Sequence, residues 1–314
     1  MQPHILSAAG EAVVIRTPTA FVLGAGASYC YHFPLGQRLC QTVSEDFREG
    51  GGLLEAFLRN TTFTKGELEE FIRELQYSGQ NSIDAFLENR QEYLNIGKAI
   101  MSFLLISYEQ PDLLWTFQPN NWMRYLFERM RASTLEAFSQ NEVAFITFNF
   151  DRSLEHFLFE SLKKTYGASD EDVSAVLSEI PLIHLHGRLG FLPWQRTTSA
   201  RAYSPEVNAE MIELSVQDIK LVHEELKDGR DKDFTEAKRL LGLAERIYLL
   251  GFGFGDVNVS RLGLPDLLPG RAVATAFGFT QHEVSSLNKK CGEKVSIYPN
   301  YNIETLFREM VIWE

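Results

Sequence analysis

The chain has 314 residues and a mass of 35.8 kDa, enough for one large domain or two modest ones with a full hydrophobic core. Hydrophobic residues make up 45% and charged residues 23%, which is ordinary for a globular protein and excludes a disordered or collagen-like chain. The 30 basic and 42 acidic residues give a formal net charge of −12 at pH 7. Because phosphate contacts need clustered cations, we expect no direct binding to nucleic acid or to an anionic membrane surface.

The cysteines and the apolar segments indicate the compartment. Cys30, Cys40 and Cys291 are scattered without a Cys-x-x-Cys pair, so we expect neither a structural zinc site nor a disulfide framework. The N-terminal region lacks a signal peptide's unbroken apolar core, and the most apolar internal run, residues 99–108, is well short of the roughly 20 residues of a membrane span. These features predict a cytoplasmic protein without a metal and without a membrane anchor.

Short apolar runs that end at glycine or polar residues recur along the chain. They lie at residues 20–23, 143–148, 182–185, 246–250, 272–277 and, more weakly, 294–298. They are apolar nearly throughout, as in strands that are covered on both faces of a parallel sheet. Helical patterns separate several of them, for example at residues 234–245 with Asp233 as the expected N-cap. The pattern predicts an α/β fold with a Rossmann-like open parallel sheet and helices on both faces.

Two stretches interrupt this alternation. Residues 34–140 read as almost purely helical, and we interpret them as a helical module inserted after the first strand. The predicted domains are therefore 1–33 together with 141–314 for the Rossmann-like domain, and 34–140 for the inserted module. A second, irregular stretch, residues 191–210, is either a lid over a cleft or a long surface loop.

Two glycine-rich turns follow predicted strands. In Gly24-Ala25-Gly26-Ala27-Ser28 the glycines allow a tight turn that brings backbone N–H groups close to a phosphate, and Ser28 adds a hydroxyl group. The segment does not match GxxxxGK[ST], which disfavours a nucleoside triphosphatase. The later segment GFGFGD, which starts at Gly251, suggests backbone pressed against a ribose or an adenine. A plain glycine turn is the alternative for each.

Polar residues end the second and third predicted strands. The segment TFNFD places Asn149 and Asp151 at a strand's carboxyl end, where an open sheet binds its ligands, although Asp151 has the alternative of capping the next helix. His184 and His186 share a face by the two-residue period of a strand, and His186 is the better candidate because it ends the strand. Two histidines without a third ligand make a poor metal site. In a parallel sheet these four strand ends converge on one crevice.

The ordered set GAGAS, TFNFD, LHG and GFGFGDVN resembles the motifs of the sirtuin-like (SIR2-like) family, specifically the bacterial defence-associated branch that hydrolyses NAD. SIDAFLENR, residues 82–90, is similar to a segment in the helical module of those members. The resemblance runs from about Thr19 to Asn258. Unlike the deacylases of the family, the chain has no four-cysteine zinc ribbon, carries HFPLGQRL in place of a GIPDFR-like segment, and has Phe148 where they have glutamine.

The resemblance implies both a reaction and its residues. NAD would be the substrate, cleaved to nicotinamide and ADP-ribose, with Asn149 and His186 as catalytic residues that face one pocket. The implied NAD-binding residues are Gly24, Ala25, Gly26 and Ser28 at the phosphates, Asp151 near the carboxamide, and Gly251, Gly253 and Asn258 on the adenosine side. The implied role is that of an effector in a prokaryotic anti-phage (abortive infection) system, gated by homo-oligomerisation or by a partner protein.

The chemistry suits so small a set of side chains. Nicotinamide leaves as a neutral molecule, so the enzyme must orient the ribose, stabilise an oxocarbenium-like state and admit water. One amide and one imidazole can supply orientation and base catalysis. The alternative of a different class is a non-catalytic module that binds NAD or ADP-ribose and regulates a partner. Deacylation is disfavoured by the missing zinc ligands, and hydride transfer by the missing third glycine of GxGxxG.

Overall fold

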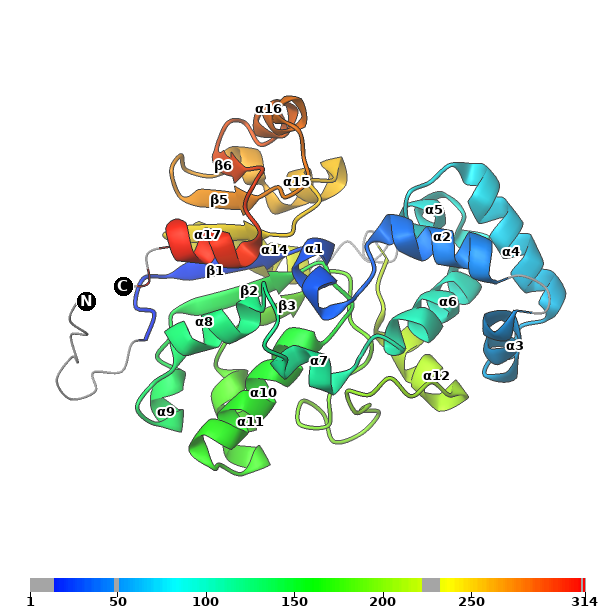
Figure 1. Ribbon diagram of the computed structural model, residues 1–314, viewed down its shortest axis with the longest axis horizontal. Helices are drawn as coiled ribbons and strands as arrows, with labels where there is room; N and C mark the ends of the chain where they lie inside the picture. Colours follow the sequence, from blue (N-terminus) through cyan, green and yellow to red (C-terminus); the bar gives the residue numbers. More distant parts are fainter. Residues whose placement is uncertain (1–13, 48–50, 222–231, 312, 314) are drawn as a thin grey trace.

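The structure is a computed structural model that describes residues 14–47, 51–221, 232–311 and 313. Its centre is one open sheet of six parallel strands in the order β3-β2-β1-β4-β5-β6 (Figure 1). The strands are β1 (Thr19–Leu23), β2 (Val143–Thr147), β3 (Leu182–His184), β4 (Arg246–Leu250), β5 (Ala272–Thr275) and β6 (Val295–Tyr298). The strand order reverses between β1 and β4, as in doubly wound nucleotide-binding folds. The predicted α/β class with an open parallel sheet is confirmed.

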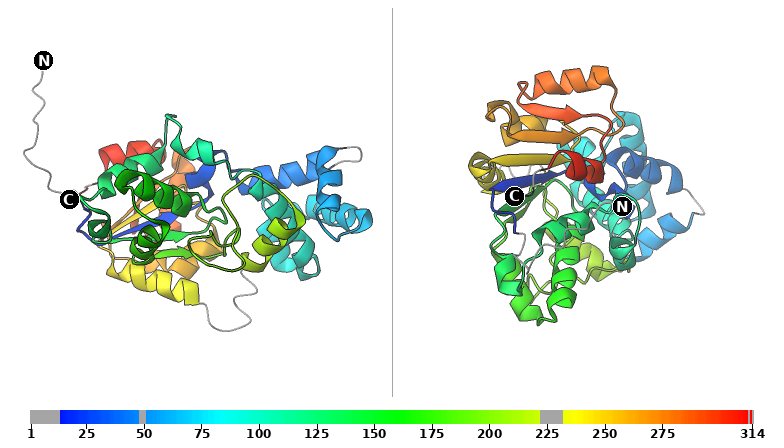
Figure 2. Two further views of the ribbon diagram at one scale, coloured as in Figure 1. Left: turned by 90° about the horizontal axis from the view of Figure 1, so that it is seen from below. Right: turned by 60° about the vertical axis from the view of Figure 1, so that its left-hand side comes forward.

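Helices cover both faces of the sheet (Figure 2). One face is covered by α8 (Trp122–Met130), α10 (Ser153–Tyr166) and α17 (Ile303–Glu309), and the other by α14 (Lys232–Leu243), α15 (Asp256–Leu262) and α16 (Gln281–Lys290). Alternate side chains of β1 enter the two cores, Phe21 on one side and Val22 on the other. This two-sided burial explains why the strands are apolar throughout. Because α14 starts at Lys232, Asp233 lies within its first turn, so the prediction that Asp233 is the N-cap is wrong.

A group of helices lies beside the carboxyl ends of the strands, and we call it the helical lobe (Figure 1). It comprises α2 (Gly36–Asp46), α3 (Gly52–Arg59), α4 (Lys65–Ser78), α5 (Ile83–Asn89), α6 (Leu94–Ile106) and the later α12 (Ala209–Asp218), which packs on α6. The inserted stretch is helical as predicted, but α7 (Pro111–Trp115), α8 and α9 (Leu135–Phe138) pack with the sheet and its helices rather than in the lobe. The lobe therefore takes only the first part of the insertion and adds a helix from later in the chain.

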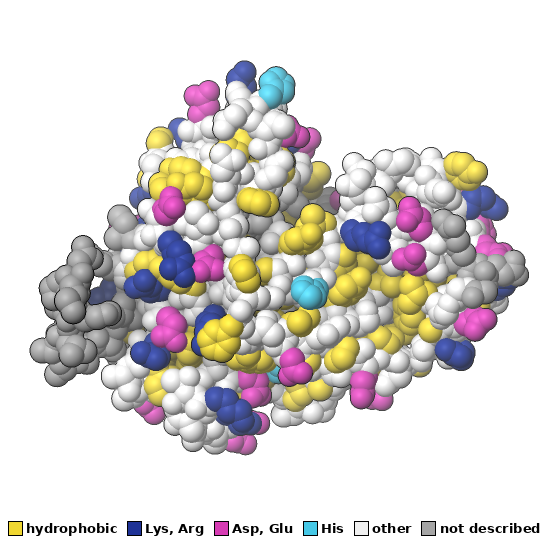
Figure 3. Space-filling view, in the orientation of Figure 1, with side chains coloured by type: hydrophobic (Ala, Val, Ile, Leu, Met, Phe, Trp, Pro, Cys, Tyr) yellow, Lys and Arg dark blue, Asp and Glu magenta, His cyan; other side chains and the backbone are white. Residues whose placement is uncertain are grey.

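The lobe and the sheet share one core. A single cluster of buried apolar side chains runs from Phe57 and Phe71 in the lobe to Phe21 and Phe145 in the sheet. On the face seen in Figure 3, apolar side chains gather along the middle, while charged side chains lie mainly around the outline. The short helices α1 (Ala25–Ser28), η1 (Tyr29–Tyr31), η2 (Gln91–Tyr93) and η3 (Leu264–Asp266), together with α11 (Asp170–Ser178), complete the described elements.

The irregular stretch after β3 is held by buried side chains. Trp194 stacks on Phe159 of α10, with ring centroids 5.0 Å apart. Tyr203 stacks on His156 of the same helix at 4.4 Å, and Arg201 is 1% exposed. These contacts favour the second of the two predicted alternatives, a long surface loop packed on the domain. In the part of the chain that the structure describes, none of the helices has the length and apolar character to cross a membrane.

Candidate functional site

The two glycine-rich loops meet at the point where the strand order reverses. The backbone N–H of Gly24 donates to the carbonyl of Leu250, and that of Gly26 to the carbonyl of Gly251, both at 3.0 Å. A Cβ atom on Gly24 would lie 2.5 Å from the Gly251 oxygen. Gly251 itself has a φ of +59°, and a Cβ there would collide with the Ala27 nitrogen. These three glycines are therefore required for the contact between the two loops.

This contact changes the expected role of the first loop. The sequence predicts that its N–H groups face a phosphate, yet those of Gly24, Gly26 and Ala27 all donate to carbonyl groups within the protein. Besides these backbone groups, the loop carries the exposed Ala25 side chain and the Ser28 hydroxyl group. The last of these is 4% exposed and belongs to a polar cluster.

The second loop is open on its outer side. Among the described residues, no atom lies within 4 Å of a Cβ built on Gly253, and one on Gly255 meets only the Asn258 amide nitrogen, at 4.0 Å. Between these glycines Phe254 has a φ of +52° and is 1% exposed. A bulky residue in the left-handed region is strained, and such strain gathers at ligand-binding segments. Lys290 of α16 holds this backbone, since its Nζ atom donates to the Phe254 carbonyl at 3.1 Å.

Three residues predicted for the site form one polar cluster. The Asn149 Nδ2 group donates to the Gly24 carbonyl and to Ser28 Oγ, both at 3.0 Å. Ser28 Oγ in turn donates to Asp151 Oδ2 at 2.6 Å. A cavity of about 10 Å³ lies beside them, at the lower limit for one water molecule. It is lined by the cluster together with Leu23, Trp122, Met123, Thr147, Leu154, Glu155 and Leu182.

Asp151 has both of the roles that its sequence position suggests. Its Oδ1 atom accepts the N–H of Ser153 at 3.1 Å at the start of α10, while Oδ2 serves Ser28. Burial raises the pKa of Asp151 above the ordinary value of 3.8, although the hydrogen bonds from Ser153 and Ser28 act in the opposite direction. A carboxyl group that is both buried and hydrogen-bonded in this way is typical of functional sites.

His184, the last residue of β3, and His186, two residues later, lie on different sides of the sheet. The strand ends at His184, and the chain turns at Gly187, which has a φ of +70° and whose N–H donates to the His184 carbonyl. The prediction that His184 and His186 share a face is therefore wrong, because the two-residue period does not extend past the end of the strand.

His184 is 3% exposed and has a partner on each ring nitrogen. Nδ1 lies 2.9 Å from the Asn149 carbonyl oxygen and Nε2 lies 3.0 Å from Glu155 Oε1. A carbonyl oxygen can only accept, so Nδ1 carries a hydrogen, and a second proton lies between Nε2 and Glu155. Burial alone would raise the pKa of Glu155, but the charge and hydrogen bond of His184 outweigh it and leave that pKa below the ordinary 4.5. His184 and Glu155 thus share one buried hydrogen bond, and the other ring nitrogen of His184 is used by the Asn149 carbonyl.

His186 has aromatic neighbours. Its half-buried ring lies 5.5 Å from the ring of Phe148 and 6.0 Å from that of Phe234, measured between centroids. Asn149, by contrast, is bonded to Gly24 and Ser28. The expected single pocket for Asn149 and His186 is thus not what the structure shows, since their side chains have different surroundings. Both are partly exposed at the carboxyl ends of adjacent strands, so a ligand that lies across those ends can touch both.

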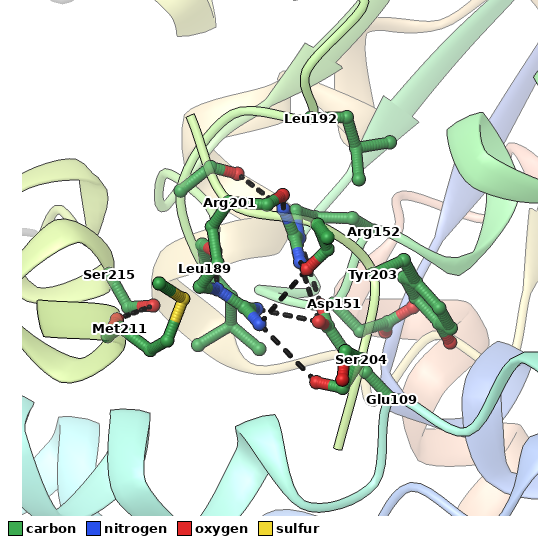
Figure 4. A network of polar contacts seen from close by, with 12 residues as sticks. Glu109, Asp151, Arg152, Leu189, Leu192, Arg201, Tyr203, Ser204, Met211 and Ser215 are labelled. Atoms are coloured by element: carbon green, nitrogen blue, oxygen red, sulfur yellow. Dashed lines mark hydrogen bonds and ion pairs between the residues drawn. The ribbon is translucent and has the colours of Figure 1, made fainter. Parts of the chain in front are cut away.

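A buried ion cluster lies next to Asp151 (Figure 4). Glu109, just after α6, accepts from Arg152 Nε at 2.9 Å and Nη2 at 2.5 Å, and from Arg201 Nη2 at 2.6 Å. Glu109 and Arg152 are fully buried and Arg201 nearly so. The sequence analysis missed this cluster and the Glu155–His184 pair. The one available signal is a charged residue within an otherwise apolar helical face, as Glu155 lies among Leu154, Phe157 and Leu158.

Comparison with known proteins supplies no further assignment. No protein-family model matches the chain, and no curated protein matches it significantly. Within the described ranges, no group of three or more His, Cys, Asp or Glu side chains is arranged to hold a metal ion. The SIR2-like assignment thus stays a prediction from the motifs, and the argument for function depends on the geometry of the sheet edge.

Proposed function

We propose that the protein is an NAD glycohydrolase that cleaves NAD to nicotinamide and ADP-ribose. The observation that carries the proposal is the meeting of the two glycine-rich loops at the β1/β4 reversal, with the Ser28–Asn149–Asp151 cluster beside them. In doubly wound sheets the crevice outside the carboxyl ends of the strands, at this reversal, is where dinucleotides bind. Because the N–H groups of Gly24, Gly26 and Ala27 are bonded within the protein, backbone contacts to such an anion would come from the second loop, whose outer side is open.

The side chains present suit the hydrolysis. Asn149 is held in one orientation by its two Nδ2 hydrogen bonds, and within the described residues no hydrogen bond reaches its Oδ1 atom. Oδ1 is thus an oriented acceptor for a ribose hydroxyl or for the attacking water. The water oxygen bonds to the anomeric carbon, the bond to nicotinamide breaks with its electrons leaving on the ring, and His186 takes the proton released by the water.

A second candidate is a non-catalytic module that binds NAD or ADP-ribose. The different surroundings of Asn149 and His186 favour it, because a general base must reach the reacting water. In that case the loops and the polar cluster would hold the ligand, and the partial exposure of His186 would serve recognition alone.

Turnover assays with the full chain separate these candidates. The protein is incubated with NAD, alone and with the proteins encoded beside it, and nicotinamide and ADP-ribose are quantified by chromatography while calorimetry measures binding. We expect turnover in at least one condition, and a loss of about 100-fold or more in Asn149→Ala and in His186→Ala. Binding without turnover supports the non-catalytic module, and the absence of both contradicts both candidates.

The sequence resemblance supports the cellular part of the proposal: a cytoplasmic effector of prokaryotic anti-phage defence, gated by homo-oligomerisation or a partner protein. Uncontrolled loss of NAD is toxic, so such an activity requires a gate. Expression of the wild type and of Asn149→Ala in a bacterial host, with cellular NAD measured during phage infection, tests this. NAD loss and growth arrest should occur together in the wild type and be absent in the variant; phage protection without NAD loss contradicts it.

A further inference from the structure

Three consecutive residues at the start of α10 connect three different parts of the molecule. Asp151 binds Ser28 of the first glycine-rich loop, and Arg152 binds Glu109 after α6 of the helical lobe. Ser153 Oγ lies 2.9 Å from the hydroxyl of Tyr203 in the irregular segment. The backbone at Asp151 is therefore fixed by its own side chain and by the contacts of the two residues that follow it.

Most N–H donors of the Arg152 and Arg201 side chains have acceptors within the protein, and Figure 4 shows part of this network. Arg152 donates from Nη1 to the Arg201 carbonyl at 2.7 Å and from Nη2 to the Ala202 carbonyl at 3.0 Å. Arg201 donates from Nε to the Leu189 carbonyl at 3.1 Å. Arg152 and Arg201 carry two positive charges and Glu109 one negative charge, and each of the three residues is at most 1% exposed. This arrangement is rigid, because a movement that breaks one of these hydrogen bonds leaves a buried charged group without a partner.

We infer that Glu109, Arg152 and Arg201 form a clasp of positioning residues, through which the helical lobe and residues 189–204 set the place of the Asp151 carboxyl group. None of the three needs to touch a ligand for this role. Any rearrangement of the lobe that moves Glu109 is transmitted to Arg152 and from there, by one peptide unit, to Asp151 and its partner Ser28. That the clasp affects NAD cleavage depends on the proposed function, whereas its effect on the position of Asp151 does not.

Hydrogen–deuterium exchange of the full chain tests the clasp without an activity assay. Glu109→Gln keeps the shape but removes the negative charge of the carboxylate that binds both guanidinium groups. We expect exchange in a peptide covering residues 147–154 to be about tenfold faster than in the wild type, because that segment opens more often. Arg201→Lys keeps the charge but loses the planar fork, and should give a smaller acceleration in the same peptide. It also serves as the test if Glu109→Gln does not fold.

The matched control is Asn141→Ala, just before β2 at the amino-terminal ends of the strands. Asn141 is also buried and makes three hydrogen bonds, to Ile15, Met130 and Phe138. It should lower the melting temperature while leaving exchange at 147–154 within about twofold of the wild type. The inference is overturned if the clasp variants leave that peptide unchanged, or if Asn141→Ala accelerates it equally.

The enzymatic readout follows from the same variants. If the wild type cleaves NAD, Glu109→Gln should lower kcat more than it raises KM, since the displaced Asp151 carboxyl group belongs to the reacting end of the site. An unchanged kcat together with faster exchange would contradict the link to catalysis. If the wild type cleaves no NAD, the proposed function fails, while the exchange result still decides the clasp.

Discussion

Residues of the same type have two different environments at the carboxyl ends of the strands. We call Gly24, Gly26, Gly251, His184 and Glu155 the committed group, because their backbone or side chains are used in contacts within the protein. Gly253, Gly255 and His186 form the open group, which borders free space or is partly exposed. The comparison teaches that a glycine or a histidine at a strand end does not by itself mark a ligand contact. Some of these residues form the internal contacts at the strand ends, and others at the same strand ends remain open.

The largest expected effect on stability comes from Gly251→Ala in the committed group. Alanine at this position would have to keep the left-handed backbone conformation of Gly251. Its methyl group would also collide with backbone atoms of the first loop, which cannot rotate away. We expect the free energy of unfolding to fall by about 4 kcal/mol or to find the variant insoluble. Urea unfolding measures it. A Gly251→Ala protein as stable as the wild type would show that the two loops are not held together as described.

Next in size is Glu155→Gln, which removes the buried carboxyl group whose Oε1 atom lies 3.0 Å from His184 Nε2. We expect the free energy of unfolding to fall by about 3 kcal/mol at neutral pH, against about 1 kcal/mol for His186→Ala in the open group. The pKa of Glu155 is lowered in the folded protein, so this stabilisation is present above the unfolded value of about 4.5 and is lost as the pH falls through the folded value. The difference between wild type and Glu155→Gln should therefore shrink in acid. Urea unfolding at pH 7 and below pH 4.5 measures it, and a difference independent of pH would contradict a lowered pKa of Glu155.

Asp151 shares features of both groups. Its carboxyl group is hydrogen-bonded within the protein, yet it is part of the candidate site. Its pKa is raised, so the stabilisation from this group is fully present below the unfolded value of 3.8 and declines as the pH rises through the folded value. Asp151→Asn should accordingly gain stability relative to the wild type as the pH rises, staying within about 1 kcal/mol of it at pH 7. Thermal unfolding between pH 3 and pH 8 follows this trend. A variant that loses stability relative to the wild type with rising pH would show that the carboxylate, not the acid, is favoured.

The sequence predicts the fold more completely than it predicts the contacts of the candidate site. Strands buried on both faces leave a continuous apolar run, and the residues of β4 were predicted with the observed bounds. The cluster of Ser28, Asn149 and Asp151 was predictable because parallel strands place their carboxyl ends together. The Glu155–His184 pair and the Glu109 clasp were not, because they depend on which helical face packs where, over separations of 29 residues in the first case and 43 in the second. The separation of His184 from His186 depends on one turn that the two-residue period cannot foresee.

The smallest expected effect on stability is that of Gly253→Ala, which is for that reason the sharpest test of the open group. In the part of the chain that the structure describes, no atom lies within 4 Å of the added methyl group, and the residue needs no left-handed backbone. The free energy of unfolding should therefore change by less than about 0.5 kcal/mol. If the open side faces the ligand, the same methyl group should reduce NAD affinity at least about tenfold. The methyl group would occupy the space through which NAD approaches the backbone of the loop. Calorimetric titration of NAD and urea unfolding on the same preparation measure both quantities. Gly242→Ala is the matched control, since Gly242 of α14 also has free space around it but lies within the helix. Equal NAD affinity in the two variants would remove Gly253 from the site and leave the open side of the second loop without a ligand.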